Sequence, residues 1–160
     1  MSEVLIIFGS KSDTEKMRGA ALALKELEIS YSARILSAHR VPEKLEETVA
    51  AFEARGGKVI IAGAGLAAHL PGVVASRTCL PVIGVPINGA IGGLDALFSI
   101  VQMPKSIPVA TVGLDISYNA GLLAAQILSV GNPVLREKLK AARLKIKEKF
   151  IAENTEGIDL

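Results

Sequence analysis

The chain has 160 residues, with 18 lysines and arginines against 16 aspartates and glutamates, so its formal net charge is +2. Half of the residues are hydrophobic, which at this length predicts one folded domain over residues 1–160 and excludes an intrinsically disordered chain. The weak net charge and the few aromatic residues argue against binding to nucleic acid.

Cysteine and histidine are scarce. Cys79 is alone, so no intrachain disulfide forms, which predicts a reducing, cytoplasmic environment; we expect Cys79 to be a small buried side chain. With only His39 and His69 beside it, no transition-metal site is expected. The N-terminal apolar run at residues 4–8 is too short for a signal or membrane segment, so no membrane association is expected.

Five short apolar runs predict β-strands in chain order at residues 4–8, 31–36, 59–62, 82–85 and 109–112. Segments with helical periodicity lie between them. A capping-box pattern at residues 12–15 opens the first helix, Pro42 suits the first turn of the second, and Gly56 and Gly57 end that second helix. A further helix is predicted at 118–130. This alternation predicts an α/β fold with a parallel sheet, and the nearly all-apolar strands indicate helices on both faces.

A last, charged helix is predicted at about residues 133–151, after the core at residues 1–130. Its apolar residues fall on one stripe, which comprises Leu135, Leu139, Ala142, Ile146 and Phe150. Either this stripe packs on its own domain, or the helix extends past the sheet and packs on a neighbouring subunit.

In an open α/β sheet the ligand lies outside the carboxyl ends of the strands, and the unusual residues of this chain follow the strands. After the first strand, Ser10, Ser12 and Asp13 at a helix N-terminus suit a phosphate, and Asp13 suits a sugar hydroxyl. Alternatively, Ser12 or Asp13 only caps the helix. Ser10 is placed too early for a cap.

The loop after the second strand holds Ser37, Ala38, His39 and Arg40. His39 can act as acid and base near neutral pH, and Arg40 suits forked recognition of a phosphate or carboxylate; alternatively, the pair is a backbone-bonded histidine beside a solvated arginine. After the third strand, residues 63–65 predict close backbone approach to a ligand and exposed amides at a helix start. His69 begins a short apolar helix at residues 69–75, so it is either a site residue or a helix-start residue. From the residues alone, the ligand is a small phosphate-bearing molecule.

The same loops resemble a known family. The blocks at residues 9–13, 37–40, 63–72, 80–86, 99–104 and 119–128 are similar in order and spacing to 5-(carboxyamino)imidazole ribonucleotide mutase, the PurE family of purine biosynthesis. The resemblance covers about residues 4–130 and implies a flavodoxin-like three-layer α/β/α fold. It also implies a homo-octamer with C-terminal helices that reach neighbouring subunits.

The implied reaction moves a carboxylate from the exocyclic amine of the ribonucleotide to ring carbon 4, without ATP, metal or organic cofactor. By the same resemblance, Ser10, Asp13 and Arg40 bind the substrate and His39 transfers protons. We assign Ser12, Ser37, Ala38, Gly65 and His69 to substrate binding as well. A separate ATP-dependent carboxylase would supply the substrate.

Three positions depart from the family pattern. Val41 replaces a usual threonine, Leu66 replaces a usual glycine, and the stretch 87–92 is short and poor in hydroxyl groups. Three alternatives stay open: a related branch that carboxylates 5-aminoimidazole ribonucleotide directly with carbon dioxide, a receiver-like signalling module and a flavin-binding electron carrier. The receiver needs an aspartate at the end of the third strand, where Ala62 and Gly63 stand, and the carrier lacks an aromatic sandwich for its flavin.

Overall fold

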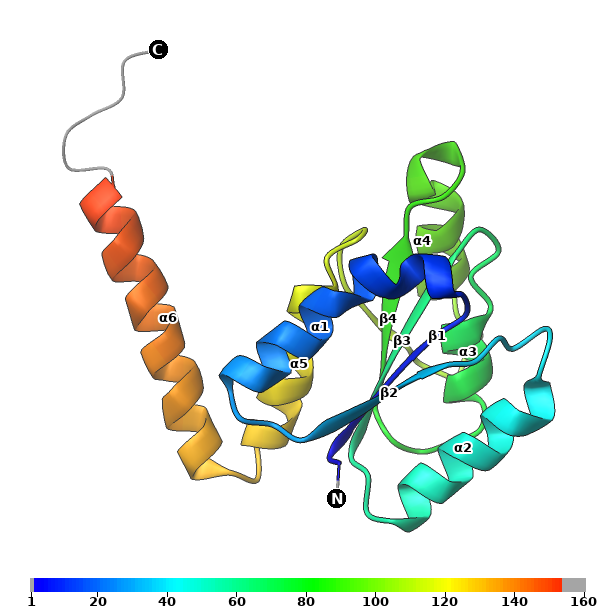
Figure 1. Cartoon of the computed structure of the whole chain (residues 1–160), viewed down its shortest axis with the longest axis horizontal. Coiled ribbons are helices and arrows are strands. Elements are labelled where there is room, and N and C mark those ends of the chain that lie inside the picture. Colours follow the sequence, from blue (N-terminus) through cyan, green and yellow to red (C-terminus); the bar gives the residue numbers. More distant parts are fainter. Residues whose placement is uncertain (1, 154–160) are drawn as a thin grey trace.

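A five-stranded parallel sheet forms the centre of the computed structural model, which describes residues 2–153 (Figure 1). Met1 and residues 154–160 of the predicted domain lie outside the described residues. The strands are β1 (Val4–Phe8), β2 (Tyr31–Ile35), β3 (Val59–Gly65), β4 (Val82–Ile87) and β5 (Ala110–Thr111). The helices are α1 (Thr14–Glu26), α2 (Pro42–Ala54), α3 (Leu70–Ala75), α4 (Leu94–Val101), α5 (Ser117–Ser129) and α6 (Pro133–Glu153). Two 3-10 turns, η1 (Lys11–Asp13) and η2 (Ile91–Gly93), precede α1 and α4.

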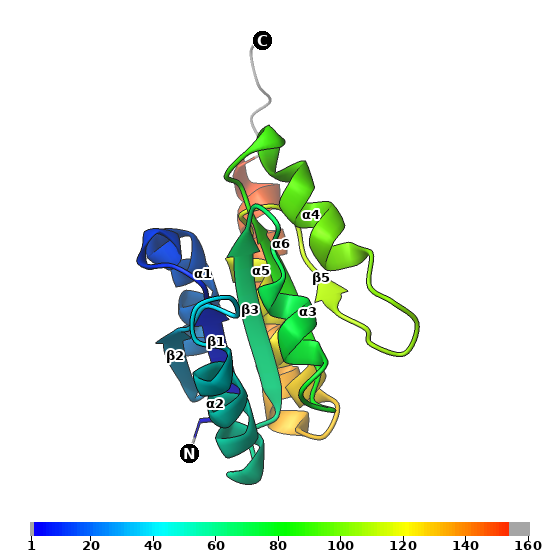
Figure 2. The ribbon, with the colours of Figure 1, turned by 90° about the vertical axis from the view of Figure 1, so that its right-hand side faces the viewer.

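The strand order is β2-β1-β3-β4-β5, and every neighbouring pair is parallel. This is the flavodoxin-like order, so the predicted three-layer fold is confirmed. Helices α1 and α5 cover one face of the sheet, and α2, α3 and α4 cover the other (Figures 1 and 2).

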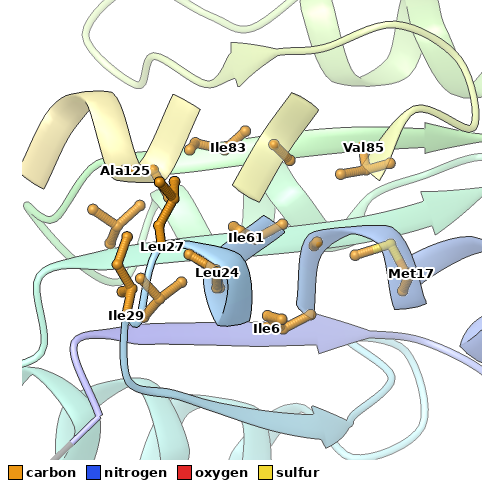
Figure 3. Packing of buried hydrophobic residues seen from close by; sticks show 14 of the residues in the cluster. Ile6, Met17, Leu24, Leu27, Ile29, Ile61, Ile83, Val85 and Ala125 are labelled. Atoms are coloured by element: carbon orange, nitrogen blue, oxygen red, sulfur yellow. The ribbon is translucent and has the colours of Figure 1, made fainter. Parts of the chain in front are cut away.

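Two hydrophobic clusters hold the layers together, one on each face. Because side chains alternate along a strand, Ile6 of β1 and Ile61 of β3 face α1 and α5, whereas Leu5 and Ile60 face α2 and α3. Figure 3 shows the first cluster, where Leu24 of α1 and Ala125 of α5 lie against these strands. The central strands are buried on both faces, which explains why their sequences read as continuous apolar runs.

The structure differs from the predicted elements at their ends. β3 and β4 are longer than predicted, because Gly65 and Ile87 still pair with each other at the site edge of the sheet. β5 is only two residues long and pairs with β4 alone. Helix α4 was not predicted, although Ala96 and Ile100, four residues apart, are both fully buried. No described helix is both long and apolar enough to span a membrane.

Helix α6 packs on its own domain only at its start. Leu135 and Leu139 are buried against the cluster that contains α5, whereas Ile146 is 65% and Phe150 67% exposed. Figure 1 shows the second half of the helix projecting away from the sheet. Packing of the whole stripe on its own domain is therefore not observed.

The prediction for Cys79 is wrong. The side chain is exposed in the loop between α3 and β4. In that loop the neighbouring Thr78 forms the side-chain hydrogen bonds. Its hydroxyl donates to Glu53 Oε2 at 2.6 Å and accepts from the Leu80 backbone amide at 3.0 Å.

Candidate active site

A cleft of about 650 Å³ lies at the carboxyl ends of β1, β2, β3 and β4, a size that suits a small organic ligand. Its position follows from the strand order, because β1 and β3 are adjacent and their connections run to opposite faces of the sheet. All of the predicted site residues line it, namely Ser10, Ser12, Asp13, Ser37, Ala38, His39, Arg40, Gly65 and His69. The residues that the sequence singled out are therefore brought together in one cleft.

The loop after β1 is organised by serine hydroxyls. Ser10 caps the η1 turn: its side chain accepts from the Ser12 amide at 3.3 Å and from the Ser12 hydroxyl at 2.8 Å. The expectation that Ser10 lies too early for a cap is therefore wrong, because η1 begins before α1 and moves the first helical turn back to Lys11.

The predicted capping box does not form. Asp13 stands at the N-cap of α1 but makes no side-chain cap bond, and Thr14 donates instead to the Lys11 carbonyl oxygen at 2.7 Å. Oδ1 of the Asp13 carboxylate lies 3.2 Å from the Ser12 hydroxyl oxygen, and Asp13 lines the cleft. It is therefore placed to accept further hydrogen bonds from a ligand.

The loop after β2 presents its polar residues in a tight turn. The Leu36 amide still donates to the Phe8 carbonyl at 3.0 Å, and the Val41 amide closes the turn by donating to the Ser37 carbonyl at 3.1 Å. His39 and Arg40 lie at the exposed apex of this turn. Both line the same cleft as Ser10, Ser12 and Asp13.

The two histidines of the chain meet in the cleft. His39 Nε2 lies 2.7 Å from His69 Nδ1, and the two rings are nearly perpendicular at 78°. One of these nitrogens must donate and the other accept, so each ring fixes the tautomer of the other. His69 makes no cap bond to α3, which begins at Leu70, so the helix-start role alone does not describe it.

The loop after β3 approaches the cleft less directly than predicted. Gly63 is covered by α1: a Cβ there would lie 2.3 Å from the Met17 sulfur, so this glycine makes room for the core and not for a ligand. Only Ala64 and Gly65 of the glycine-rich run line the cleft, and α3 begins five residues after Gly65. The expected amides at a helix start are therefore not directly adjacent to that run.

Leu66 has a strained backbone. Its φ of 55° lies in the left-handed region that leucine rarely adopts, and its side chain is 58% exposed. The side chain reaches the loop after β4, since a Cβ on Gly89 would lie 3.3 Å from Leu66 Cδ2. The Leu66 side chain thus brings the loop after β3 into contact with the loop after β4.

Lys16, Asn88 and Gly89 also line the cleft and were not assigned as site residues. Asn88 and Gly89 belong to the loop after β4. Such a loop is expected to line a ligand site, because it follows the carboxyl end of a strand. Lys16 follows Asp13 by three residues on the same helical side, and this spacing was the available signal.

The ionisable groups of the cleft favour an anionic ligand. Arg40 and Lys16 are the cationic side chains among the lining residues, Lys16 pairs with Asp115 at 3.4 Å, and Asp13 is the carboxylate among the lining residues. The arrangement therefore suits a ligand with a phosphate or carboxylate group and a hydroxyl group that donates to Asp13.

Comparison with known proteins places the chain in a family. The family model described as AIR carboxylase matches residues 3–149. The chain belongs to this family. N5-carboxyaminoimidazole ribonucleotide mutase from Pyrococcus abyssi is 55% identical over 148 residues, which cover 92% of this chain and 85% of that protein. The phosphoribosylaminoimidazole carboxylase of Schizosaccharomyces pombe is 49% identical over 144 residues, which cover 89% of this chain and 26% of that protein.

Among solved structures, PurE from Treponema denticola superposes with a TM-score of 0.88 at 30% identity and covers 96% of both chains. The resemblance to the PurE family that the loop residues indicated is therefore confirmed, as is the fold that it implied.

Proposed function

We propose that the chain is an N5-carboxyaminoimidazole ribonucleotide mutase. This name is a synonym of 5-(carboxyamino)imidazole ribonucleotide mutase. It converts its substrate into 5-aminoimidazole ribonucleotide-4-carboxylate without ATP, metal or organic cofactor. The observation that carries this proposal is the pairing of His39 with His69 in a cleft that Arg40, Asp13, Ser10 and Ser12 also line. Membership of the family and the 55% identical mutase support it.

Substrate binding divides among the loops that line the cleft. Arg40 pairs with an anionic group of the ribonucleotide through two parallel N–H donors. Ser10, Ser12 and Asp13 bind the ribose and phosphate, and Ser37, Ala38 and Gly65 also line the cleft. This places the imidazole ring of the substrate near His39.

His39 then acts twice. As imidazolium it gives a proton to the amine nitrogen while the bond between this nitrogen and the carboxylate carbon breaks, with its electron pair remaining on nitrogen. Carbon dioxide and 5-aminoimidazole ribonucleotide result, both in the cleft. Ring carbon 4 attacks the carbon dioxide, and neutral His39 removes the proton from that carbon to restore aromaticity. The proton given is regained, so the reaction is an isomerisation.

His69 supports this cycle through the 2.7 Å contact between its Nδ1 and His39 Nε2. Neutral His69 can accept from the His39 imidazolium, which holds the ring in one orientation while it is charged. Carbon dioxide offers few hydrogen-bonding groups, so it is retained by closed walls. Ala64, Ala68 and Leu70 supply buried apolar side chains to the lining of the cleft, and the exposed Leu66 lines it beside Gly89.

The proposal is tested by supplying freshly made N5-carboxyaminoimidazole ribonucleotide in one cuvette, and 5-aminoimidazole ribonucleotide with bicarbonate-derived carbon dioxide in another, both without ATP. Efficient formation of the carboxylated product from the first supports the mutase. Product formed only from 5-aminoimidazole ribonucleotide and carbon dioxide would assign the chain to direct carboxylation. The similarity to the fission-yeast carboxylase supports testing this alternative. No product from either would overturn both functions.

We further propose that the chain forms one domain over residues 1–160 and assembles as a homo-octamer in the cytoplasm. The exposed apolar residues in the second half of α6 favour contact with a neighbouring subunit. The lone cysteine favours a reducing compartment. Because the substrate is a carbamate, an ATP-dependent carboxylase acting on 5-aminoimidazole ribonucleotide would supply it.

A further inference from the structure

We propose that Lys16 and Asp115 form a clamp on the Asn88 peptide and are positioning residues for the ribonucleotide. The clamp fixes the wall of the cleft that Asn88 and Gly89 form. This inference rests on the proposed function for its kinetic consequence but not for its structural one.

The three residues form a closed ring. The Lys16 ammonium group donates to the backbone carbonyl oxygen of Asn88, and the backbone N–H of Asn88 donates to Asp115 Oδ1 at 2.9 Å. Asp115 Oδ2 lies 3.4 Å from Lys16 Nζ and closes the ring as an ion pair. The backbone carbonyl and the backbone N–H of Asn88 are thus each held by a charged side chain. Lys16 belongs to α1, and Asp115 belongs to the segment before α5.

Both anchors are themselves fixed. The Asp115 amide donates to the Pro86 carbonyl at 2.9 Å, and its φ of 57° is a left-handed conformation that aspartate tolerates. The Ser117 hydroxyl at the start of α5 donates to the Lys16 carbonyl on α1. The clamp is therefore attached to two packed helices and to β4.

The segment that follows Asn88 needs such an anchor. Ile91, Gly92 and Gly93 have φ values of 47°, 64° and 80°, and the Ile91 side chain is 77% exposed. The Gly93 amide donates locally to the Ala90 carbonyl at 2.7 Å. With little buried surface in this segment, the direction in which the chain leaves β4 depends on the Asn88 peptide.

Lys16 and Asp115 are each about one third exposed, at 36% and 35%, so their ion pair alone contributes little to global stability. The effect falls instead on the shape of the cleft. Loss of one hydrogen bond to the Asn88 peptide should weaken substrate binding about 3- to 10-fold. The proton transfers of His39 should continue at the normal rate once the substrate is bound.

The test uses four variants: Lys16→Met, Lys16→Arg, Asp115→Gly and the double variant Lys16→Met with Asp115→Gly. Glycine removes the acceptor for the Asn88 backbone N–H and tolerates the left-handed backbone at position 115, so the turn is preserved. Lys58→Met is the matched control, because Lys58 pairs with Glu3 at 2.8 Å near the amino ends of β1 and β3, away from the cleft. The readouts are kcat, KM, Tm and the hydrogen-exchange rate of the Asn88 amide in the substrate-free protein.

The clamp predicts that Lys16→Met and Asp115→Gly raise KM by similar factors, with kcat and Tm near those of the parent chain. It also predicts faster exchange of the Asn88 amide in both, recovery in Lys16→Arg and a double variant no worse than the worse single one. Lys58→Met should change none of these. A KM effect confined to Lys16→Met would indicate direct contact with the substrate and overturn the clamp, as would unchanged exchange at Asn88. Faster exchange in a protein without mutase activity would refute the proposed function while leaving the clamp intact.

Discussion

Leu66→Gly tests whether the strained leucine in the lining of the cleft retains carbon dioxide. Three effects on stability oppose one another. The left-handed backbone costs leucine about 1–2 kcal/mol, which glycine does not incur. The leucine side chain is 58% exposed, so its burial contributes only part of what a fully buried leucine would contribute. Removing it therefore costs about 1 kcal/mol. The extra freedom of an unfolded glycine costs about 0.5–1 kcal/mol.

These terms nearly cancel, so the free energy of unfolding of Leu66→Gly should stay within about 1 kcal/mol of the parent value, a Tm shift of a few degrees. Leu66→Ala is the matched comparison. It loses the same contacts but keeps a Cβ in the left-handed region, so we expect it to be less stable than Leu66→Gly.

Function should respond differently. Both variants open the wall between Leu66 and Gly89, so more turnovers should release 5-aminoimidazole ribonucleotide in place of the carboxylated product. Chromatography of the two nucleotides after partial conversion measures this ratio, with the spontaneous loss of carbon dioxide from the carbamate subtracted. A large loss of stability in Leu66→Gly, or an unchanged product ratio in both variants, would refute the reasoning.

Three further predictions concern the proton-transfer residue, the helix packing and the assembly. His39→Asn should lower kcat about 10²- to 10⁴-fold while titration calorimetry still detects ribonucleotide binding, because Arg40 and the serine loop remain. Gly121→Ala should lower the free energy of unfolding by about 1–3 kcal/mol in thermal melts, since its Cβ would lie 2.7 Å from the Ala20 carbonyl oxygen. Ile146→Lys should reduce the mass of the assembly in analytical ultracentrifugation, because it places a charge on the exposed stripe of α6.

Each of these has a result that contradicts it. Near-normal turnover of His39→Asn would exclude His39 from proton transfer. Gly131→Ala is the control for Gly121→Ala, because a Cβ at Gly131 meets nothing within 4 Å; equal melting of the two variants would refute the packing argument. An unchanged mass for Ile146→Lys would show that the stripe does not contribute to subunit contacts.

Much of the fold was readable from the sequence because a parallel sheet buries its strands on both faces. Runs such as residues 4–8 and 82–85 are therefore apolar throughout and easily recognised. The position of the candidate site was predicted by the rule that ligands bind at the carboxyl ends of the strands, and a cleft lies there. That rule needs only the order of the elements.

Several details that were missed or wrong depend on contacts between residues far apart in the chain. Gly63 resembles a ligand-approach glycine, but its missing Cβ accommodates Met17 from α1. The His39–His69 contact joins residues 30 apart, and the Lys16–Asn88 bond joins residues 72 apart, so neither spacing is visible as a local pattern. Ser10 failed for a local reason, because a single 3-10 turn shifted the start of the helical segment.

The central claim is that the carboxylate is transferred within one cleft, and isotope labelling tests it most directly. The substrate carries ¹³C in its carbamate carboxylate, the buffer contains unlabelled bicarbonate, and mass spectrometry reads the label in the product after a partial turnover of the pool. The account predicts that the product retains most of the label. A product carrying the isotopic composition of the bicarbonate would contradict it, because the carbon dioxide would then have come from solution.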